Sequence, residues 1–209
     1  MSSCIARIPS GAERNTIADP EPPKVPELPL TPADRVALLA LARCAIEAAL
    51  AGRPVPGIPD VPAAAQQRGA FVALHAADGD LRGCVGQVKG DRPLGEVVRQ
   101  VAVSAAQSDP RFAPVTREEL AELRIEVSVL TAPVRVVGPD RCCLMIGRDG
   151  VLVRRGRAQS LLLPQVATEQ GFGPEAFLNA VCHKAGLSPG SWRDPATHVF
   201  TFTADVFVE

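Results

Sequence analysis

Two short apolar segments on either side of an Asp-Gly pair constrain the fold of this chain most strongly. Residues 71–76 and 81–88 have the strand composition and alternation of a half-buried sheet, and Asp78-Gly79 between them is typical of a tight hairpin turn. The strands expected along the chain mostly come as hairpins, with helices between the groups, and this order indicates an antiparallel sheet. The sequence therefore predicts a sheet with this hairpin inside it.

The hairpin also predicts which side chains share a face. If the loop consists of Asp78 and Gly79 alone, His75 lies opposite Arg82 and Ala73 lies opposite Cys84. One face then carries Phe71, Ala73, His75, Arg82 and Cys84, whereas Val72, Leu74, Leu81 and Val85 form the core face. A bulge at Gly83 would break this register.

The second strand contains the motif Leu81-Arg82-Gly83-Cys84-Val85-Gly86. Glycines allow a close approach of another backbone or a ligand, and a neighbouring guanidinium favours the thiolate, the nucleophilic form of cysteine. Cys84 is therefore the leading candidate for a functional residue. The alternative interpretation is a buried structural cysteine on a core strand.

The rest of the chain predicts an α+β fold, with a mainly antiparallel sheet flanked by helices. Residues 1–30 are rich in proline and predict a mobile tail, and residues 31–209 form the folded domain. Thr31 is the expected N-cap of the first helix. Helices are expected over 32–50, 93–108, a short segment after the capping box at 116–119, a short segment from 164, and 174–185, and strands over 123–129, 151–155, 159–163 and 198–208.

Composition excludes several classes of protein. With 22 basic and 23 acidic side chains the formal charge is −1, which argues against a nucleic-acid-binding protein. The sequence shows neither a signal peptide nor an apolar run that could span a membrane. The six cysteines are scattered and include no C-x-x-C pair, so we expect reduced thiols in a cytoplasmic protein.

Motifs for metals and cofactors are missing from the sequence. Cys142-Cys143 and Cys182-His183 are adjacent pairs without the spacing of a zinc site. There is no Walker motif, no GxGxxG and no CxxxCxxC, so neither a cofactor nor a metal is expected.

Further polar residues are candidates for the same site, each with a simpler interpretation beside it. His75 and Glu126 could serve as acid or base, or could be solvated residues on the polar side of a strand. Asp109 and Arg111 could bind a ligand from a loop, or could form a helix stop with an ion pair. Gln165 could orient a ligand, although the adjacent proline favours a simple helix start.

Several blocks of the sequence resemble the AMMECR domain family, called AmmeMemoRadiSam system protein A in bacteria. The similarity runs from about Pro32 to the C-terminus, and Val85 stands where the family usually has isoleucine. The blocks occur in the family's order: residues 68–75, Leu81 to Gly86, Asp109-Pro-Arg-Phe112, Glu126-Val-Ser-Val-Leu130, Leu162-Leu-Pro-Gln-Val166 and Lys184-Ala-Gly-Leu187. The resemblance implies an α+β fold of two lobes with a cleft that holds the cysteine motif. It also implies association with a Memo-like protein and a radical S-adenosylmethionine protein.

These observations lead to two hypotheses. In the first, the protein is a small-molecule enzyme or enzyme component, with Cys84 as nucleophile or redox thiol, Arg82 stabilising an anion, and Glu126 or His75 as acid or base. The expected substrate-binding residues are Gly83, Gly86, Asp109, Arg111 and Gln165. In the second, the protein is a non-catalytic binding or adaptor module that presents a substrate or partner segment to the other two proteins.

Overall fold

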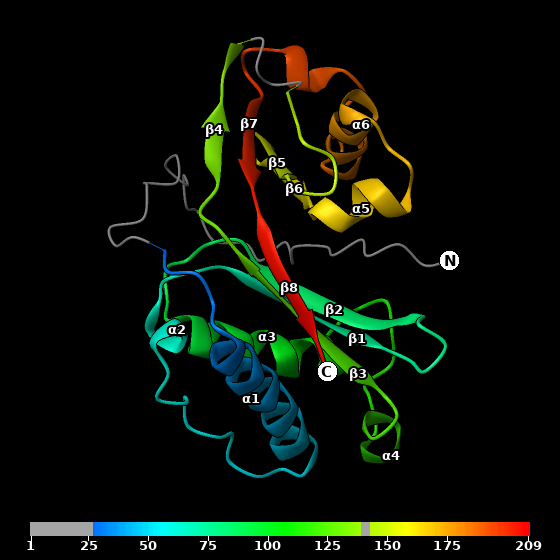
Figure 1. Ribbon diagram of the computed structural model, residues 1–209. Helices are drawn as coiled ribbons and strands as arrows, with labels where there is room; N and C mark the ends of the chain where they lie inside the picture. Colours follow the sequence, from blue (N-terminus) through cyan, green and yellow to red (C-terminus); the bar gives the residue numbers. More distant parts are fainter. Residues whose placement is uncertain (1–26, 139–142) are drawn as a thin grey trace. The chain divides into compact units, whose positions relative to one another are not determined.

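The computed structural model describes residues 27–138 and 143–209, which fall into two compact units (Figure 1). Unit 1 contains residues 27–132 together with Asp205–Glu209, and unit 2 contains Pro133–Ala204. The chain therefore leaves unit 1 after its third strand and returns to it for its last one.

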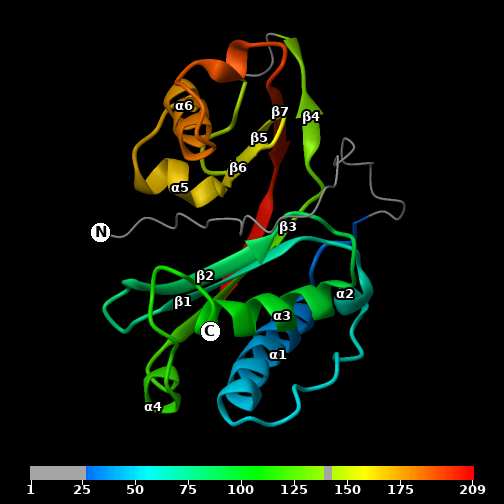
Figure 2. The same ribbon diagram turned by 180° about the vertical axis from the view of Figure 1, so that it is seen from behind.

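Unit 1 is a four-stranded sheet in the order β2-β1-β3-β8, with helices packed against one face. Figure 2 shows α1 and α3 side by side below this sheet. Its elements are α1 (Pro32–Leu50), α2 (Pro62–Ala65), β1 (Ala70–His75), β2 (Leu81–Gln87), α3 (Leu94–Gln107), α4 (Arg117–Leu120), β3 (Arg124–Leu130) and β8 (Ala204–Val208).

Local capping signals fix the ends of the helices in unit 1. Thr31 accepts a hydrogen bond from the Asp34 backbone, and the Asp34 carboxylate accepts one in return from the Thr31 backbone, so α1 begins with a complete capping box. Thr116 and Glu119 form the same arrangement at α4. Both helix starts were predicted from the sequence and are confirmed.

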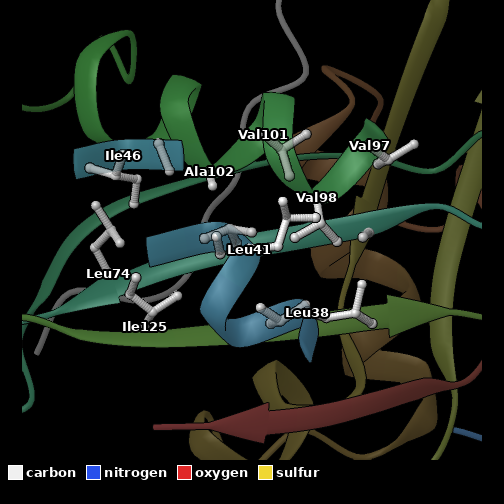
Figure 3. Packing of buried hydrophobic residues seen from close by; sticks show 14 of the residues in the cluster. Leu38, Leu41, Ile46, Leu74, Val97, Val98, Val101, Ala102 and Ile125 are labelled. Carbon is white, nitrogen blue, oxygen red and sulfur yellow. The ribbon is translucent and has the colours of Figure 1, made fainter. Parts of the chain in front are cut away.

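The core of unit 1 lies between the two long helices and the sheet (Figure 3). Apolar side chains of α1 and α3 meet the alternate residues of β1 and β3 that face them. The fully buried members include Leu38, Ile46, Val97, Val98, Leu74 and Ile125. One face of the sheet therefore packs against the helices, and the other face carries the candidate site.

The hairpin of β1 and β2 differs from the predicted register at its loop end. Ala73 pairs with Cys84 as predicted, but His75 pairs with Leu81, so the prediction that His75 lies opposite Arg82 is wrong. Arg82 has no direct partner in β1 and is the extra residue of a β-bulge. The cause is a three-residue loop that ends at Gly79, whose φ of 90° supplies the left-handed residue such loops require.

Unit 2 is a second four-stranded antiparallel sheet, in the order β4-β7-β5-β6. The predicted hairpin around Gly156 is confirmed, and the helix that begins at Pro164 follows it. Its elements are β4 (Val134–Val136), β5 (Gly150–Arg155), β6 (Ala158–Leu162), α5 (Pro164–Glu169), α6 (Pro174–Lys184), the 3-10 helix η2 (Ser191–Arg193) and β7 (His198–Phe202).

The single long strand predicted over residues 198–208 is wrong. The segment divides at Thr203 into β7 of unit 2 and β8 of unit 1, which belong to different sheets (Figure 1). The alternation of apolar and polar residues continues through the division, although its apolar members are buried in β7, at Phe200 and Phe202, and exposed in β8, at Val206 and Val208. The period alone therefore could not reveal the change of sheet.

The predicted α+β fold class is confirmed by these two sheets and their helices. Of the predicted N-terminal tail, residues 1–26 lie outside the described part of the chain, whereas residues 27–30 are part of unit 1. Leu30 is buried, and the Glu27 carboxylate accepts a hydrogen bond from the Ala132 backbone. No helix within the described residues is long and apolar enough to cross a membrane.

Candidate functional site

The face of the unit 1 sheet opposite the helices brings together a thiol, a carboxylate and an imidazole. Ala73 in the central strand β1 pairs with Cys84 on one side and with Glu126 on the other, so the three side chains share one face. Between the Cys84 thiol and the Glu126 carboxylate, β1 contributes only the methyl group of Ala73. We call this surface the thiol face; it carries Phe71, Ala73, His75, Cys84, Glu126 and Ser128.

The backbone of Cys84 is held at the free edge of the sheet. Because β2 is an edge strand, the peptide groups of Cys84 that point away from β1 need partners outside the sheet. The Cys84 N–H donates to Asp109 Oδ2 at 2.8 Å, and Arg111 Nη2 donates to the Cys84 carbonyl at 3.2 Å. The predicted loop residues Asp109 and Arg111 therefore contact the motif directly, through its main chain.

Asp109 and Arg111 also bind each other as the predicted ion pair. Arg111 donates from Nε to Oδ1 at 2.9 Å and from Nη2 to Oδ2 at 2.7 Å, and its backbone N–H donates to Oδ1 at 3.1 Å. Burial alone would raise the pKa of Asp109, but the hydrogen bonds from Arg111 and from the Cys84 amide outweigh it, and the pKa is lowered. We call this pair the edge clamp.

The two glycines of the motif have packing roles. A Cβ at Gly83 would overlap the carbonyl oxygen of Ala105, so Gly83 lets α3 approach the core face of β2. A Cβ at Gly86 would overlap the ring of Phe71, which pairs with it across the hairpin. These contacts account for both glycines, and Cys84 between them is 2% exposed.

His75 and Glu126 form a second pair on the thiol face. The distance between His75 Nε2 and Glu126 Oε2 is 3.8 Å, and both side chains are partly shielded from solvent. His75 Nε2 is buried and has no hydrogen-bond partner among the described residues. The 3.8 Å separation is longer than the roughly 2.6–3.2 Å over which a base takes a proton directly, so the two groups are in ion-pair contact without a hydrogen bond between these atoms.

Arg82 forms an ion pair with Glu119 of α4. Its guanidinium donates to both carboxylate oxygens of Glu119, through Nε to Oε1 and through Nη2 to Oε2 at 3.1 Å, and lies 5.8 Å from the centre of the Phe112 ring. Sequence reasoning identified Glu119 only as part of the α4 capping box. Its position three residues after Thr116 explains that function but gave no sign of the contact with β2.

Gln165 lies on α5 of unit 2, whereas Cys84 lies in unit 1. The Gln165 Oε1 atom is buried and has no hydrogen-bond partner within the part of the chain that the structure describes. Cys182, the buried thiol of α6, has a raised pKa because of burial, which a hydrogen bond with the Trp192 backbone only partly offsets. Within residues 27–138 and 143–209, no group of three or more His, Cys, Asp or Glu side chains could hold a metal ion.

Together, these features define an α+β protein of two units, with a candidate thiol site on a sheet edge held by an Asp-Pro-Arg loop. The AMMECR1 family model matches residues 39–207 of the chain. The chain therefore belongs to the AMMECR1 family.

Similar proteins support this assignment. A protein of Methanothermobacter thermautotrophicus is 44% identical over 189 residues, covering 87% of this chain and 97% of its own. One from Thermococcus gammatolerans is 44% identical over 181 residues, covering 82% and 88%. The crystal structure of an uncharacterised protein from Pyrococcus horikoshii matches with a TM-score of 0.78 at 41% identity, over 82% of this chain and 89% of that one.

Proposed function

We propose that this protein acts on a small molecule at the thiol face, with Cys84 as the nucleophile or redox-active group. The observation that carries the proposal is the shared pairing of Cys84 and Glu126 with Ala73. This arrangement places a thiol and a carboxylate on one face with only a methyl group between them. A substrate atom held above Ala73 would be flanked by both groups.

The surrounding residues have separable tasks in this proposal. The edge clamp fixes the main chain of Cys84, so the thiol is presented from a rigid strand. The His75–Glu126 pair supplies the group that accepts or returns a proton. Arg82, neutralised by Glu119, orders the loop around Phe112 and is at most an indirect stabiliser of an anion.

The resemblance described above also leads us to propose that the protein works with a Memo-like protein and a radical S-adenosylmethionine protein, in the cytoplasm. The free thiols of Cys44 and Cys182 are compatible with a reducing compartment.

The first experiment measures the alkylation rate of each cysteine as a function of pH, by peptide mass spectrometry on the native protein. Exposed Cys44 and buried Cys182 are internal references for an ordinary and a protected thiol. An activated Cys84 forms its thiolate below about pH 8.5 and reacts ahead of Cys44. His75→Gln is expected to move the Cys84 midpoint, because it removes an ionisable group from the same face. A Cys84 midpoint at or above that of Cys44 would contradict the proposal.

A second candidate function is a non-catalytic binding module, favoured by the low exposure of the Cys84 side chain and by the pairing of Arg82 with Glu119. Only the enzymatic function requires the Cys84 thiol. In a system reconstituted with both partner proteins, Cys84→Ser abolishes turnover if the thiol reacts, whereas a binding module keeps both its complexes and full turnover. Cys44→Ser is the matched control, since Cys44 is an exposed thiol on α1.

A further inference from the structure

Unit 1 contains a pocket of about 440 Å³ that lies away from the thiol face. It is formed where the last turns of α1 meet α4, and none of its lining residues belongs to β1, β2 or β3. Its volume is in the range of small-molecule sites. The lining residues are Arg43, Glu47, Leu50, Ala51, Arg53, Arg117, Leu120 and Ala121.

One of the three arginines in the pocket is already neutralised. The Arg43 guanidinium binds the Glu209 carboxylate and donates to the carbonyls of Leu120 at 3.2 Å and Leu123 at 2.7 Å. Arg43 thereby connects α1 with α4 and with Glu209, the residue that follows β8. Arg43 therefore forms a rigid wall of the pocket and adds no uncompensated charge to it.

The other two arginines keep positive charge at the pocket. Arg117 donates one hydrogen bond, from Nε to the Leu50 carbonyl at 3.4 Å, which leaves its terminal nitrogens for another acceptor. Arg53 is exposed and follows Gly52, the left-handed residue after α1. Glu47 is the one acidic residue of the lining, so with Arg43 neutralised the balance is one positive charge.

We propose that this pocket binds a small organic carboxylate with a short apolar body. The carboxylate would lie between Arg53 and Arg117, whose planar guanidinium groups match its two oxygens. The apolar body would lie against Leu50, Ala51 and Leu120. The net single charge favours a monoanion over a polyanion such as a nucleotide or nucleic acid. This site is independent of the function proposed for Cys84.

A simpler explanation for the two arginines predicts a different result. The last turn of α1 has no basic residue, so Arg53 and Arg117 could serve only to complement the negative end of the helix dipole. In that case removing either one lowers the stability of the fold slightly, and no anion binds.

The experiment is a titration of the full chain with three matched probes, followed by NMR chemical shifts and calorimetry. The probes are pentanoate, acetate and 1-pentanol. Pentanoate is expected to saturate the pocket, and both acetate and 1-pentanol are expected to bind more weakly, acetate by up to about fourfold for each methylene that is no longer buried. The affinity for pentanoate should fall as salt is raised, because the arginines are partly exposed.

Variants show whether the pocket is the site. Arg53→Gln and Arg117→Gln are each expected to weaken pentanoate binding by about fivefold. Arg157→Gln, at an exposed arginine in the turn between β5 and β6, is the control and leaves binding unchanged. Cys84→Ser also leaves it unchanged, so failure of the thiol proposal can be told apart from failure of this one. Absence of saturation by pentanoate, or equal binding by the wild type and both pocket variants, would overturn the proposal.

Discussion

Two carboxylates of unit 1, one in the loop after α3 and one in β3, have opposite environments. Asp109 is 5% exposed, and both of its oxygens receive hydrogen bonds from Arg111 and from the backbone of Cys84 and Arg111. The Glu126 side chain is 23% exposed and has His75 at 3.8 Å. Asp109 is thus held in its charged form by its hydrogen bonds, whereas Glu126 is partly exposed and lies 3.8 Å from His75.

This difference separates the stability of the site from its chemistry. Groups at the edge and on the core face of β2 hold Cys84 in place, whereas the proposed function assigns the action on a substrate to groups on the thiol face. Substitutions on the two sides should therefore have different readouts. Those at the edge change the free energy of unfolding, and those on the thiol face change the reactivity of Cys84.

The largest effect is expected for Asp109→Ala. The change leaves the Cys84 amide without its acceptor and Arg111 without its counter-ion, which should lower the free energy of unfolding by about 3 kcal/mol. Glu126→Gln, the comparison variant, should cost less than about 1 kcal/mol because its side chain is partly exposed. Urea denaturation of both variants measures the contrast. Equal losses would remove the distinction between the two carboxylates.

Gly83→Ala is expected to cost about 2 kcal/mol, because the added methyl group forces β2 away from the Ala105 carbonyl of α3. Gly57→Ala is the matched control, since a Cβ there meets no atom within 4 Å. The same denaturation curves report both variants. If Gly83→Ala were as stable as Gly57→Ala, the close approach of α3 to the motif would not constrain it.

A smaller effect is expected in the pH dependence of stability. The native pKa of Asp109 is lowered relative to about 3.9 in the unfolded chain, so the unfolded state binds more protons in that window. The stabilisation by Asp109 is complete above the unfolded pKa and is lost as the pH falls through the lower native pKa. Asp109→Asn, which cannot ionise, should therefore lose less stability than the wild type between neutral pH and about pH 2. Denaturation midpoints at matched pH values test this, and parallel curves would contradict it.

The sequence predicted the features that depend on a few adjacent residues. The predictions that were wrong concern details of how separate segments pair and pack. Thr31 and Pro32 locate the start of α1 because a cap depends on a few adjacent residues. The pairing of Ala73 with Cys84 followed from the hairpin alone. The bulge at Arg82 did not follow, because Asp78-Gly79 suits a two-residue loop as well as the observed three-residue loop.

The same limit applies to the candidate site. The spacing of Asp109 and Arg111 suggested an ion pair, but nothing local indicated that the pair would bind the backbone of Cys84. The sequence predicted that Gly83 lets another backbone or a ligand approach closely, but it did not indicate that the approaching group is the Ala105 carbonyl of a helix, 22 residues further along the chain. Such contacts depend on how α3 lies against the sheet, and hydrophobic periodicity does not specify that.

The smallest effect is expected for Arg82→Gln. This variant tests whether Arg82 belongs with the groups that stabilise β2 or with those that change the reactivity of Cys84. Arg82 and Glu119 are both partly exposed, so loss of their ion pair and of the contact with Phe112 should cost at most about 1 kcal/mol. If Arg82 acts only through Glu119, Glu119→Gln reproduces this loss, and neither variant moves the pH midpoint of Cys84 alkylation. A midpoint raised by Arg82→Gln and unchanged by Glu119→Gln would instead mean that the guanidinium acts on the thiolate directly. Arg82 would then belong with His75 and Glu126 among the groups that act on the thiol face.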